Sequence, residues 1–556
     1  MDLNDPGSKP SDRVVELLQL YASPRASAAQ LLCDRHDPVG VAYTLLAPDL
    51  SPTDLRYGAL REESERLADA FHALGLRAGD RVATLMGKSR AFLVTVMAIW
   101  RLGAVHVPLF TAFARPALAF RLRASGSKAV VCDAAQRSKL VPGDDMPDTA
   151  QWNLVTTGPA DSEALAYDDL LASGRPGFVA ASLGGKAPII QIYTSGTTGA
   201  PKGVLVPLRA VAAFQIYAEY GLGLRPDDVY WNAADPGWAY GLYFGIVAPL
   251  AIGLKGILFE GGFSAETTLA VLTRQAVTNF TAAPTVFRSL RASGLKPPGE
   301  LKIRCASSAG EPLTPDVNEW SVMVLGVPVH DHYGQTEAGM LINNHHHSAL
   351  HGAIKPGSMG RSMPGWTAAV LKPDQNETAS TGESGRVAMD LIRSPLAWFE
   401  GYVDGSASGA EKFSADGRWY CTGDTGRVDE DGYFYFSSRD DDVIIMAGYR
   451  IGPFEVESVL ATHPAVDECA AVAVPDAIRG EVLEAVVVLQ KEFVPSLELT
   501  AELQDWVKRR FAAHAYPRRV HYMSALPKTP SGKIQRYVLR DQLREQAKAG
   551  EAPPCG

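Results

Sequence analysis

Short apolar segments alternate with helical segments through the first part of the chain. Residues 60–76 have the spacing of an amphipathic helix, and residues 89–103 are expected to form another helix. Apolar runs at residues 81–87, 104–110 and 128–133 have the length and composition of buried strands. Strands that alternate with helices predict an α/β fold class with a largely parallel sheet. Such a sheet binds its ligands beyond the carboxyl ends of its strands.

The length and a change of composition predict two domains and a tail. The chain has 556 residues, whereas a single core stops growing at roughly 250–300 residues. The sequence is rich in glycine and loops up to Arg439, and after Asp442 it becomes a compact series of strands and helices. We therefore expect a large N-terminal domain over residues 1–440, a small α+β C-terminal domain over residues 441–545, and a polar tail over residues 546–556.

Composition excludes several classes of protein. The net charge of −9 gives no general attraction to nucleic acid or anionic lipid. The six cysteines lie far apart without a C-x-x-C motif, which argues against a disulfide framework or a zinc ribbon. There is no signal-peptide pattern and no run of about 18 apolar residues. A cytoplasmic protein without a membrane span is expected.

The segment YTSGTTGAPKG, Tyr193–Gly203, has the chemistry of a polyphosphate-binding loop. It follows the apolar run APIIQI, and its glycines allow backbone N–H groups to turn toward an anion. It differs from a Walker A loop, which needs G-x-x-x-x-G-K-[ST]. A flexible surface loop is the alternative, and the ordered hydroxyls that end in Pro-Lys-Gly argue against it. The expected ATP-binding residues of this loop are Thr194, Ser195, Gly196, Thr197, Thr198, Gly199 and Lys202.

This loop and six later segments resemble the motifs of the adenylate-forming superfamily, which includes acyl-CoA synthetases, luciferases and the adenylation domains of peptide synthetases. The six segments follow in the family's order: SAGEP at 308–312, YGQTE at 333–337, YCTGD at 420–424, SRDDD at 438–442, MAGYRIG at 446–452 and PKTPSGK at 527–533. The resemblance implies a large N-terminal adenylate-forming domain of mixed α/β subdomains and a small, mobile C-terminal domain.

The resemblance also implies ATP, Mg²⁺ and coenzyme A as cofactors and substrates. Glu337 is the expected metal ligand, because Mg²⁺ prefers a few carboxylates together with substrate phosphates. The expected catalytic residues are Lys533, Glu337, Thr336 and Lys202. Outside the phosphate loop, the expected ATP-binding residues are Gly310, Glu311, Pro312, Asp331, His332, Tyr333, Gly334, Gln335, Thr336, Asp424, Arg439 and Lys533.

Such a site forms an acyl-adenylate and then a thioester. A carboxylate oxygen attacks the α-phosphorus of ATP and releases pyrophosphate, after which a thiol displaces AMP. The resemblance implies that the small domain rotates about the hinge residue Asp441, so that Lys533 leaves and a CoA-binding face arrives. The expected CoA-binding residues are Gly448, Tyr449, Arg450 and Lys508, although Arg509 and Arg510 compete with Lys508 for this role.

The acid is expected to be larger than acetate. The segment DPGWAYG at 235–241 resembles the acyl pocket of acetyl- and medium-chain acyl-CoA synthetases. Acetate-specific members carry a tryptophan just before Gln-Thr-Glu, where this chain has Gly334. The expected acyl-pocket residues are Trp238, Tyr240, Gly241 and Gly334. A medium-chain, branched or aromatic acid follows, unless a bulky residue elsewhere refills the space.

Two alternatives to an acyl-CoA synthetase stay open. A stand-alone adenylating enzyme can load a separate carrier protein, although no carrier domain is visible in the sequence. A nucleotide-binding protein without turnover is disfavoured by the presence of both Lys533 and Glu337. The pattern P-x-x-x-x-G-K at 527–533 also resembles the sequence that protein acetyltransferases modify, so an acetyltransferase and a deacetylase acting on Lys533 are expected partners.

A histidine cluster provides one further hypothesis. His345, His346 and His347 with His351 include an i, i+4 pair that can bind metal. No cysteine or carboxylate lies close by in sequence to complete four ligands, so a polar loop is the expected structure.

Overall fold

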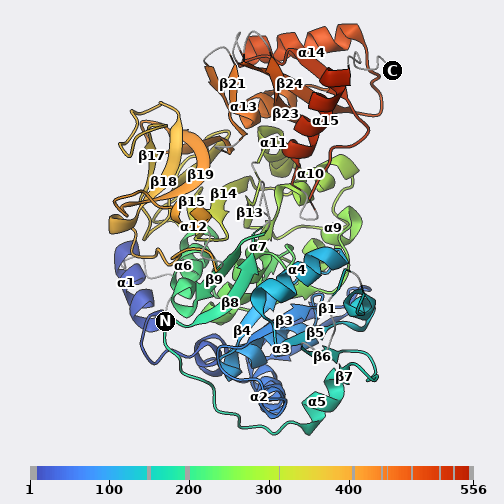
Figure 1. The fold of residues 1–556 in the computed structure, drawn as a ribbon, viewed down its shortest axis with the longest axis vertical. Coiled ribbons are helices and arrows are strands. Elements are labelled where there is room, and N and C mark those ends of the chain that lie inside the picture. Colours follow the sequence, from blue (N-terminus) through green and yellow to red (C-terminus); the bar gives the residue numbers. More distant parts are fainter. Residues whose placement is uncertain are drawn as a thin grey trace.

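The computed structural model describes residues 9–143, 145–146, 152–194, 201–311, 313–403, 407–439, 442–446, 449–476, 480–511, 515–529 and 533–549. Figure 1 shows a large body that contains the labelled strands up to β19, and a smaller unit, from β21 onward, at the top. This arrangement confirms a mixed α/β fold class with a large N-terminal domain and a small C-terminal one.

The first sheet contains the strands predicted from the apolar runs. Its seven strands have the order β7-β6-β5-β3-β4-β8-β9, and all neighbours are parallel except β8 and β9. The strands are β3 (Arg81–Leu85), β4 (Val105–Pro108), β5 (Ala129–Cys132), β6 (Asn153–Thr156), β7 (Leu165–Ala166), β8 (Pro188–Tyr193) and β9 (Gly203–Pro207). The predicted helices at 60–76 and 89–103 are α2 (Tyr57–Ala73) and α3 (Arg90–Leu102).

Helix α3 shows how local sequence sets the boundaries of an element. The Ser89 side chain accepts a hydrogen bond from the N–H of Phe92 and caps the first turn. Gly103, at φ +76°, ends the helix in a left-handed conformation that glycine adopts at little cost. Every residue from Phe92 to Leu102 is buried, because the helix is covered on all sides within the domain.

The second sheet carries most of the predicted site. Its order is β17-β18-β19-β20-β16-β15-β14-β13-β12-β10-β11-β1-β2. Neighbours are antiparallel from β17 to β14, parallel from β14 to β1, and antiparallel again between β1 and β2. The strands are β1 (Val41–Leu46), β2 (Pro52–Arg56), β10 (Tyr230–Asn232), β11 (Gly256–Phe259), β12 (Asn279–Ala282), β13 (Cys305–Ala309), β14 (Val329–Gln335), β15 (Gly339–Asn343), β16 (Ser358–Ser362), β17 (Ala368–Leu371), β18 (Gly385–Asp390), β19 (Trp419–Val428) and β20 (Phe434–Arg439).

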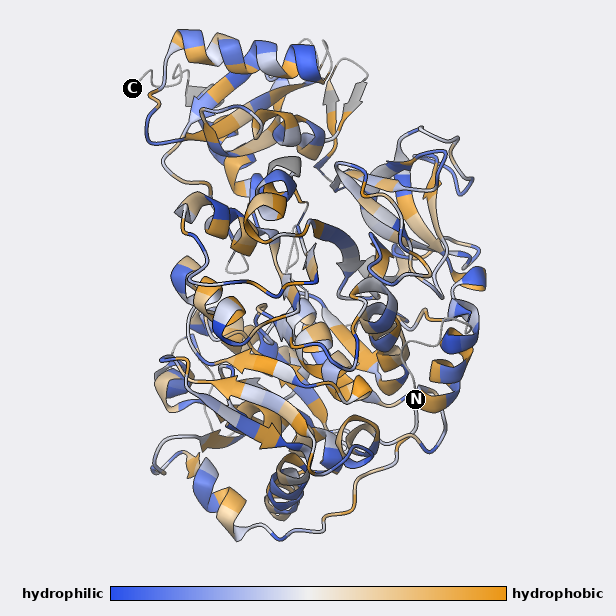
Figure 2. Ribbon diagram, turned by 180° about the vertical axis from the view of Figure 1, so that it is seen from behind, coloured by the Kyte–Doolittle hydropathy of each residue, from blue (hydrophilic) through white to orange (hydrophobic). Residues whose placement is uncertain are grey.

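Helices surround these two sheets. Figure 2 shows apolar residues gathered on the central strands, with hydrophilic residues on the outer turns of the helices. The other helices of the large domain are α1 (Pro10–Tyr21), α4 (Arg115–Ser125), α5 (Tyr167–Ser173), α6 (Val211–Ile216), α7 (Ala239–Leu242), α8 (Ala248–Ile252), α9 (Ala265–Arg274), α10 (Pro284–Ser293), α11 (Pro315–Val324) and α12 (Ala407–Ala410). None of the helices in the described part of the chain is long and apolar enough to cross a membrane.

The C-terminal domain has its own sheet and core. Strands β21 (Ile444–Met446), β22 (Tyr449–Ile451), β23 (Val466–Asp476), β24 (Gly480–Leu489) and β25 (Arg519–Tyr522) pack with helices α13 (Pro453–Leu460), α14 (Leu497–Arg510) and α15 (Arg536–Ala549). Strands β21 and β22 pair antiparallel, and the last helix, α15, ends at Ala549.

The joint between the domains lies in a short stretch of chain. Arg439 pairs in register with Asp424 at the end of β20, and so belongs to the large domain. The Asp442 carboxylate lies 2.9 Å from Arg540 Nη1 of α15, and so belongs to the small one. Residues 440 and 441 connect the two and lie outside the described residues. The boundary at residue 440 stays a prediction.

Candidate active site

The predicted phosphate loop connects two paired strands. β8 and β9 are antiparallel neighbours, and the Thr194 N–H donates to the Lys202 carbonyl at 3.0 Å, which closes the base of the loop. The Lys202 ammonium lies 5.2 Å from the centre of the Tyr402 ring. Ser195, Gly196, Thr197, Thr198 and Gly199 lie outside the described residues, so their contact with phosphate stays a prediction.

Two of the predicted motifs are joined through a buried carboxylate. Asp424 on β19 is 4% exposed. Its Oδ2 accepts hydrogen bonds from the Tyr333 hydroxyl and from Gln335 Nε2, the latter at 2.8 Å. Tyr420 in turn donates to Gln335 Oε1 at 2.7 Å. The β14 motif thereby holds Asp424 in place, while Oδ1 lies 3.5 Å from Arg439 Nη1.

The predicted metal ligand is held by a tyrosine that the sequence motifs do not include. The Tyr402 hydroxyl donates to Glu337 Oε1 at 2.7 Å, and the Tyr243 hydroxyl donates to the carbonyl oxygen of the neighbouring Thr336 at 3.0 Å. Glu337 is buried, and its Oε2 accepts no hydrogen bond from any residue that the structure describes. One oriented hard oxygen fits Mg²⁺, which takes few protein ligands beside substrate phosphates.

The segment after β13 combines an open glycine with a fixed carboxylate. Gly310 has φ +101°, a conformation that side chains rarely adopt, and no atom lies within 4 Å of where its Cβ would be. The Glu311 carboxylate accepts hydrogen bonds from Arg288 and from the Thr285 hydroxyl. Open space beside Gly310 agrees with its predicted place at the nucleotide. Pro312 lies outside the described residues.

His332 is committed to contacts within the protein. Its Nδ1 lies 2.7 Å from the Tyr217 hydroxyl, and its Nε2 lies 3.0 Å from the Asn344 carbonyl oxygen. The predicted contact of His332 with ATP is therefore limited to its backbone. The neighbouring Asp331 is enclosed as well, and burial raises the pKa of its carboxyl well above the ordinary range.

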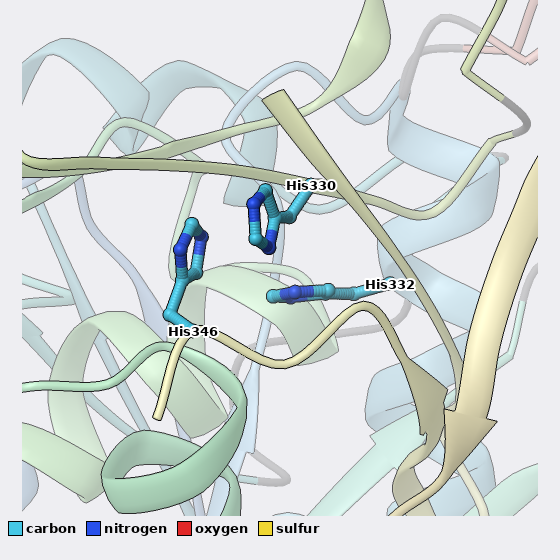
Figure 3. Close-up of side chains that lie close together, drawn as sticks. All are labelled: His330, His332 and His346. Atoms are coloured by element: carbon cyan, nitrogen blue, oxygen red, sulfur yellow. The ribbon is translucent and has the colours of Figure 1, made fainter. Parts of the chain in front are cut away.

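Three histidines lie close together at β14, as Figure 3 shows. The ligand atoms of His330, His332 and His346 lie within 4.8 Å of one another. The His330 and His346 rings are stacked, with centroids 3.6 Å apart and planes 11° from parallel. A metal ion lies in the plane of each imidazole that binds it, so two stacked rings cannot share one ion in this arrangement. His346 Nε2 instead lies 3.0 Å from the Ser307 hydroxyl.

The histidine segment of the sequence is therefore not a polar surface loop, contrary to expectation. His345 is 4% exposed, and burial lowers its pKa to about 4. His346 stacks inside the domain, and the His347 ring packs against Tyr220. His351 is the exposed end of the segment.

Three of the predicted acyl-pocket residues lie at the start of α7, with Trp238 as its N-cap and Tyr240 and Gly241 inside the helix. The Trp238 ring packs 5.3 Å from the rings of Phe110 and Phe113. Tyr240 packs against Phe244, and its hydroxyl lies 3.3 Å from that of Tyr217. Gly241 permits a close backbone approach, because a Cβ there would lie 2.1 Å from the Asp235 carbonyl oxygen.

The space beside Gly334 is bordered by the Gly339 backbone and by Met340, so a residue elsewhere refills part of it, as the sequence left open. A Cβ at Gly334 would lie 2.2 Å from the Gly339 carbonyl oxygen and 2.7 Å from Met340 Sδ. The cause is the β14–β15 hairpin, whose register shifts between Tyr333 and Gly334. Met340 therefore lies next to Gly334, the residue that stands where acetate-specific members are expected to carry a tryptophan.

The predicted residues of the small domain are described only in part. Lys533 is exposed, and its N–H donates to the Thr529 hydroxyl at 3.1 Å. Lys508 is exposed on α14, with its ammonium 5.7 Å from the Tyr516 ring centre. Tyr449 and Arg450 lie on β22, and Gly448 and Asp441 lie outside the described residues. Their roles with CoA and at the hinge stay predictions.

Sequence reasoning missed two residues that surround the predicted phosphate site. Tyr402 contacts both Glu337 and Lys202, and Lys412 lies beside Thr422 and Gly423. Neither belongs to a motif. The sequence signal for Lys412 is weak. It lies a few residues before the YCTGD segment, close enough for a turn of the chain to bring it beside that strand.

Comparison with known proteins decides the family. The model of the AMP-binding enzyme family matches residues 41–403, and that of the AMP-binding enzyme C-terminal domain matches residues 455–533. The chain belongs to the AMP-binding enzyme family. This confirms the resemblance to acyl-CoA synthetases, and such enzymes of this family use ATP, Mg²⁺ and CoA.

Individual AMP-binding enzymes are similar over most of the chain. Acetyl-coenzyme A synthetase of Bacillus subtilis is 35% identical, over 86% of this chain and 84% of the relative. The mitochondrial acyl-coenzyme A synthetase ACSM4 of Mus musculus is 37% identical, over 84% and 80%. The crystal structure of an acyl-CoA synthetase from Brucella canis aligns with a TM-score of 0.74 and 40% identity, over 98% of this chain and all of the other. These relatives support an AMP-forming CoA ligase.

Proposed function

We propose that this AMP-binding enzyme is an ATP-dependent acid–CoA ligase that acts on a carboxylic acid larger than acetate. The first half-reaction joins a carboxylate oxygen to the α-phosphorus of ATP and breaks its bond to pyrophosphate. The second joins the CoA sulfur to the acyl carbon and releases AMP, and the thiol proton passes to solvent. The chemistry needs positioning and neutralisation of charge, because both substrates of the first step are anions.

The large domain supplies fixed groups for the first half-reaction. Asp424 accepts hydrogen bonds only, which suits ribose hydroxyls, and Tyr333 and Gln335 hold it in position. Glu337, oriented by Tyr402, would bind Mg²⁺, which supplies positive charge to the phosphates when bound. Lys202 and Thr336 are proposed to contact the phosphates, and Lys533 to approach from the small domain.

Met340 is the observation that supports an acid larger than acetate. It stands beside Gly334, where acetate-specific relatives are expected to carry an indole. A methionine side chain is flexible and unbranched, so it can move aside for a longer or aromatic group where an indole cannot. Trp238 and Tyr240 are proposed to line the acyl pocket on the side opposite Met340.

The test of the proposed function is acid-dependent exchange of pyrophosphate into ATP, followed by CoA-dependent release of AMP. The acids should run from acetate to decanoate and include benzoate. Exchange with a medium-chain or aromatic acid, and faster AMP release once CoA is added, are expected. Exchange with acetate alone would contradict the proposed acid. Exchange without any CoA-dependent release of AMP would contradict the proposed ligase activity.

Changing the size of residue 340 should change the preferred acid. We expect Met340→Trp to favour acetate, and Met340→Ala to favour longer acids, by about tenfold or more in the ratio of kcat/KM for decanoate to that for acetate. Gly334→Trp is unsuitable, because its Cβ would meet the backbone of Gly339. Met323→Ala, on the exposed face of α11, is the control. An unchanged ratio in both Met340 variants would show that residue 340 does not face the acid.

Acetylation of Lys533 should stop the first half-reaction reversibly. The side chain is exposed, so a modifying enzyme can reach it, and acetylation removes the charge that neutralises the phosphates. Installing acetyl-lysine at position 533 should abolish pyrophosphate exchange, and deacetylation should restore it. Acetyl-lysine at position 528 in the same loop serves as the control. Full exchange by the protein acetylated at 533 would refute the switch.

The alternatives are not favoured. The relatives are named as coenzyme A synthetases rather than as enzymes that load carrier proteins. A protein without turnover would have no need of the ordered Tyr402–Glu337 contact beside the phosphate loop.

A further inference from the structure

Lys412 lies against the nucleotide motifs although it belongs to none of them. Its Nζ donates to the Thr422 carbonyl oxygen at 2.7 Å and lies 5.9 Å from the centre of the Tyr420 ring. The backbone places it there, because the Cys421 N–H donates to the Lys412 carbonyl at 2.7 Å. Residues 412–422 thus fold back on themselves as a hairpin, which brings Lys412 beside the YCTGD segment.

The Lys412 ammonium and the Arg439 guanidinium lie on the same side of that segment. A Cβ at Gly423 would lie 3.3 Å from Lys412 Nζ and 3.7 Å from Arg439 Nη2. The glycine therefore keeps open the space that the two cations border. Any larger residue at position 423 would also be strained, since its φ is +78°.

The charges around Lys412 are those of the proposed phosphate site. Glu337 and Asp424 act on it as attractive charges, and Lys202 and Arg439 as repulsive ones. Partial burial lowers the pKa of the Lys412 ammonium. The two carboxylates offset these charges only in part, because Lys412, Lys202 and Arg439 bring three positive charges against two negative ones.

The hydrogen-bonding capacity of Lys412 is only partly used. An ammonium has three N–H donors, and the Thr422 carbonyl takes one of them. Among the residues that the structure describes, no carboxylate lies within ion-pair distance of Nζ, and no acceptor takes the other two donors. A half-buried ammonium with donors to spare is suited to an oxyanion that arrives with a ligand.

We propose that Lys412 binds the α-phosphate of the nucleotide. This inference rests on the proposed function of the same site. In the proposed site Asp424 accepts hydrogen bonds from the ribose hydroxyls. The Lys412 ammonium only donates, so it suits the phosphate oxygens, which only accept. ATP, the acyl-adenylate and AMP all carry this phosphate, so Lys412 contacts each of them.

Lys412 therefore has a different place in the reaction from Lys533. It precedes the joint at residues 440–441 and belongs to the large domain, so it stays beside the nucleotide when the small domain moves. Loss of its charge should slow both half-reactions, because AMP is the leaving group of the second. Loss of Lys533 should slow only the first.

The test compares the affinity of the full-length protein for AMP and for adenosine by titration calorimetry. The two ligands differ by one phosphate, so their affinity ratio isolates contacts to that group. We expect Lys412→Met to weaken AMP binding about 10- to 100-fold, as for loss of a hydrogen bond to a charged group, and to leave adenosine binding unchanged. The matched control is Lys372→Met, which removes a surface lysine paired with Glu377 in the same region.

A second variant separates charge from structure. Lys412→Gln can still donate to the Thr422 carbonyl but carries no charge, so the ratio of AMP to adenosine affinity should fall in it as well. Equal loss of both affinities would show that Lys412 only supports the hairpin, and an unchanged ratio in both variants would refute the phosphate contact. Failure of the proposed function is distinguishable, since it would remove acid-dependent exchange in the unaltered protein and leave this binding ratio as it is.

Discussion

Lys533→Ala is expected to reduce acyl-adenylate formation by ~10²–10³-fold or more, the size typical of losing one preorganised donor to developing charge. The residue is exposed on the loop that precedes α15, which suits a group that enters the site from a separate domain. Thioester formation from supplied acyl-adenylate should stay near its normal rate, because the proposed rotation has by then withdrawn Lys533. The measurement is pyrophosphate exchange beside single-turnover AMP release from the adenylate with CoA.

Lys528→Ala is the matched control for that experiment. Lys528 lies in the same loop and pairs with Glu468 within the small domain, so its loss perturbs the loop without removing the proposed catalytic charge. Exchange should be nearly normal in this variant. Equal loss of both half-reactions in Lys533→Ala would contradict the model of two domain positions.

Features that depend on nearby residues could be predicted from the sequence. The spacing of apolar residues is enough to predict α2, because that helix buries a face defined by its own periodicity. The order of the motifs also predicts that Asp424 and the β14 segment share one site, because both belong to the nucleotide-binding motifs of the family that the sequence resembles. In the structure, Tyr333 and Gln335 contact that carboxylate.

Features set by contacts between distant segments could not be predicted in the same way. Met340 fills the space beside Gly334 because of an irregular register between β14 and β15, and no local pattern encodes that shift. The stacking of His346 on His330 joins segments on either side of the same hairpin. Tyr402 reaches Glu337 across 65 positions of sequence. In each case tertiary packing, rather than composition, decides which side chain occupies a site.

The joint between the domains leads to the second large effect. The register of Arg439 with Asp424 fixes one side of the joint, and Arg540 fixes the other by its contact with Asp442. We predict that rotation of the small domain takes place at residues 440 and 441, between these two contacts. Asp441 lies outside the described residues, and its role as the hinge stays a prediction from the family resemblance.

Asp441→Pro is expected to retain acyl-adenylate formation and to lose transfer to CoA by about 10²-fold. Proline fixes φ near −65° and restricts the residue before it. If the CoA-transfer position of the small domain needs another φ at residue 441, proline should destabilise that position by about 3 kcal/mol or more. Its population would then be about 10²-fold smaller. Asp441→Ala removes the same carboxylate without fixing φ, so it should keep both half-reactions. Equal losses in the proline and alanine variants would assign the effect to the side chain, and a proline variant with normal CoA transfer would move the hinge away from residue 441.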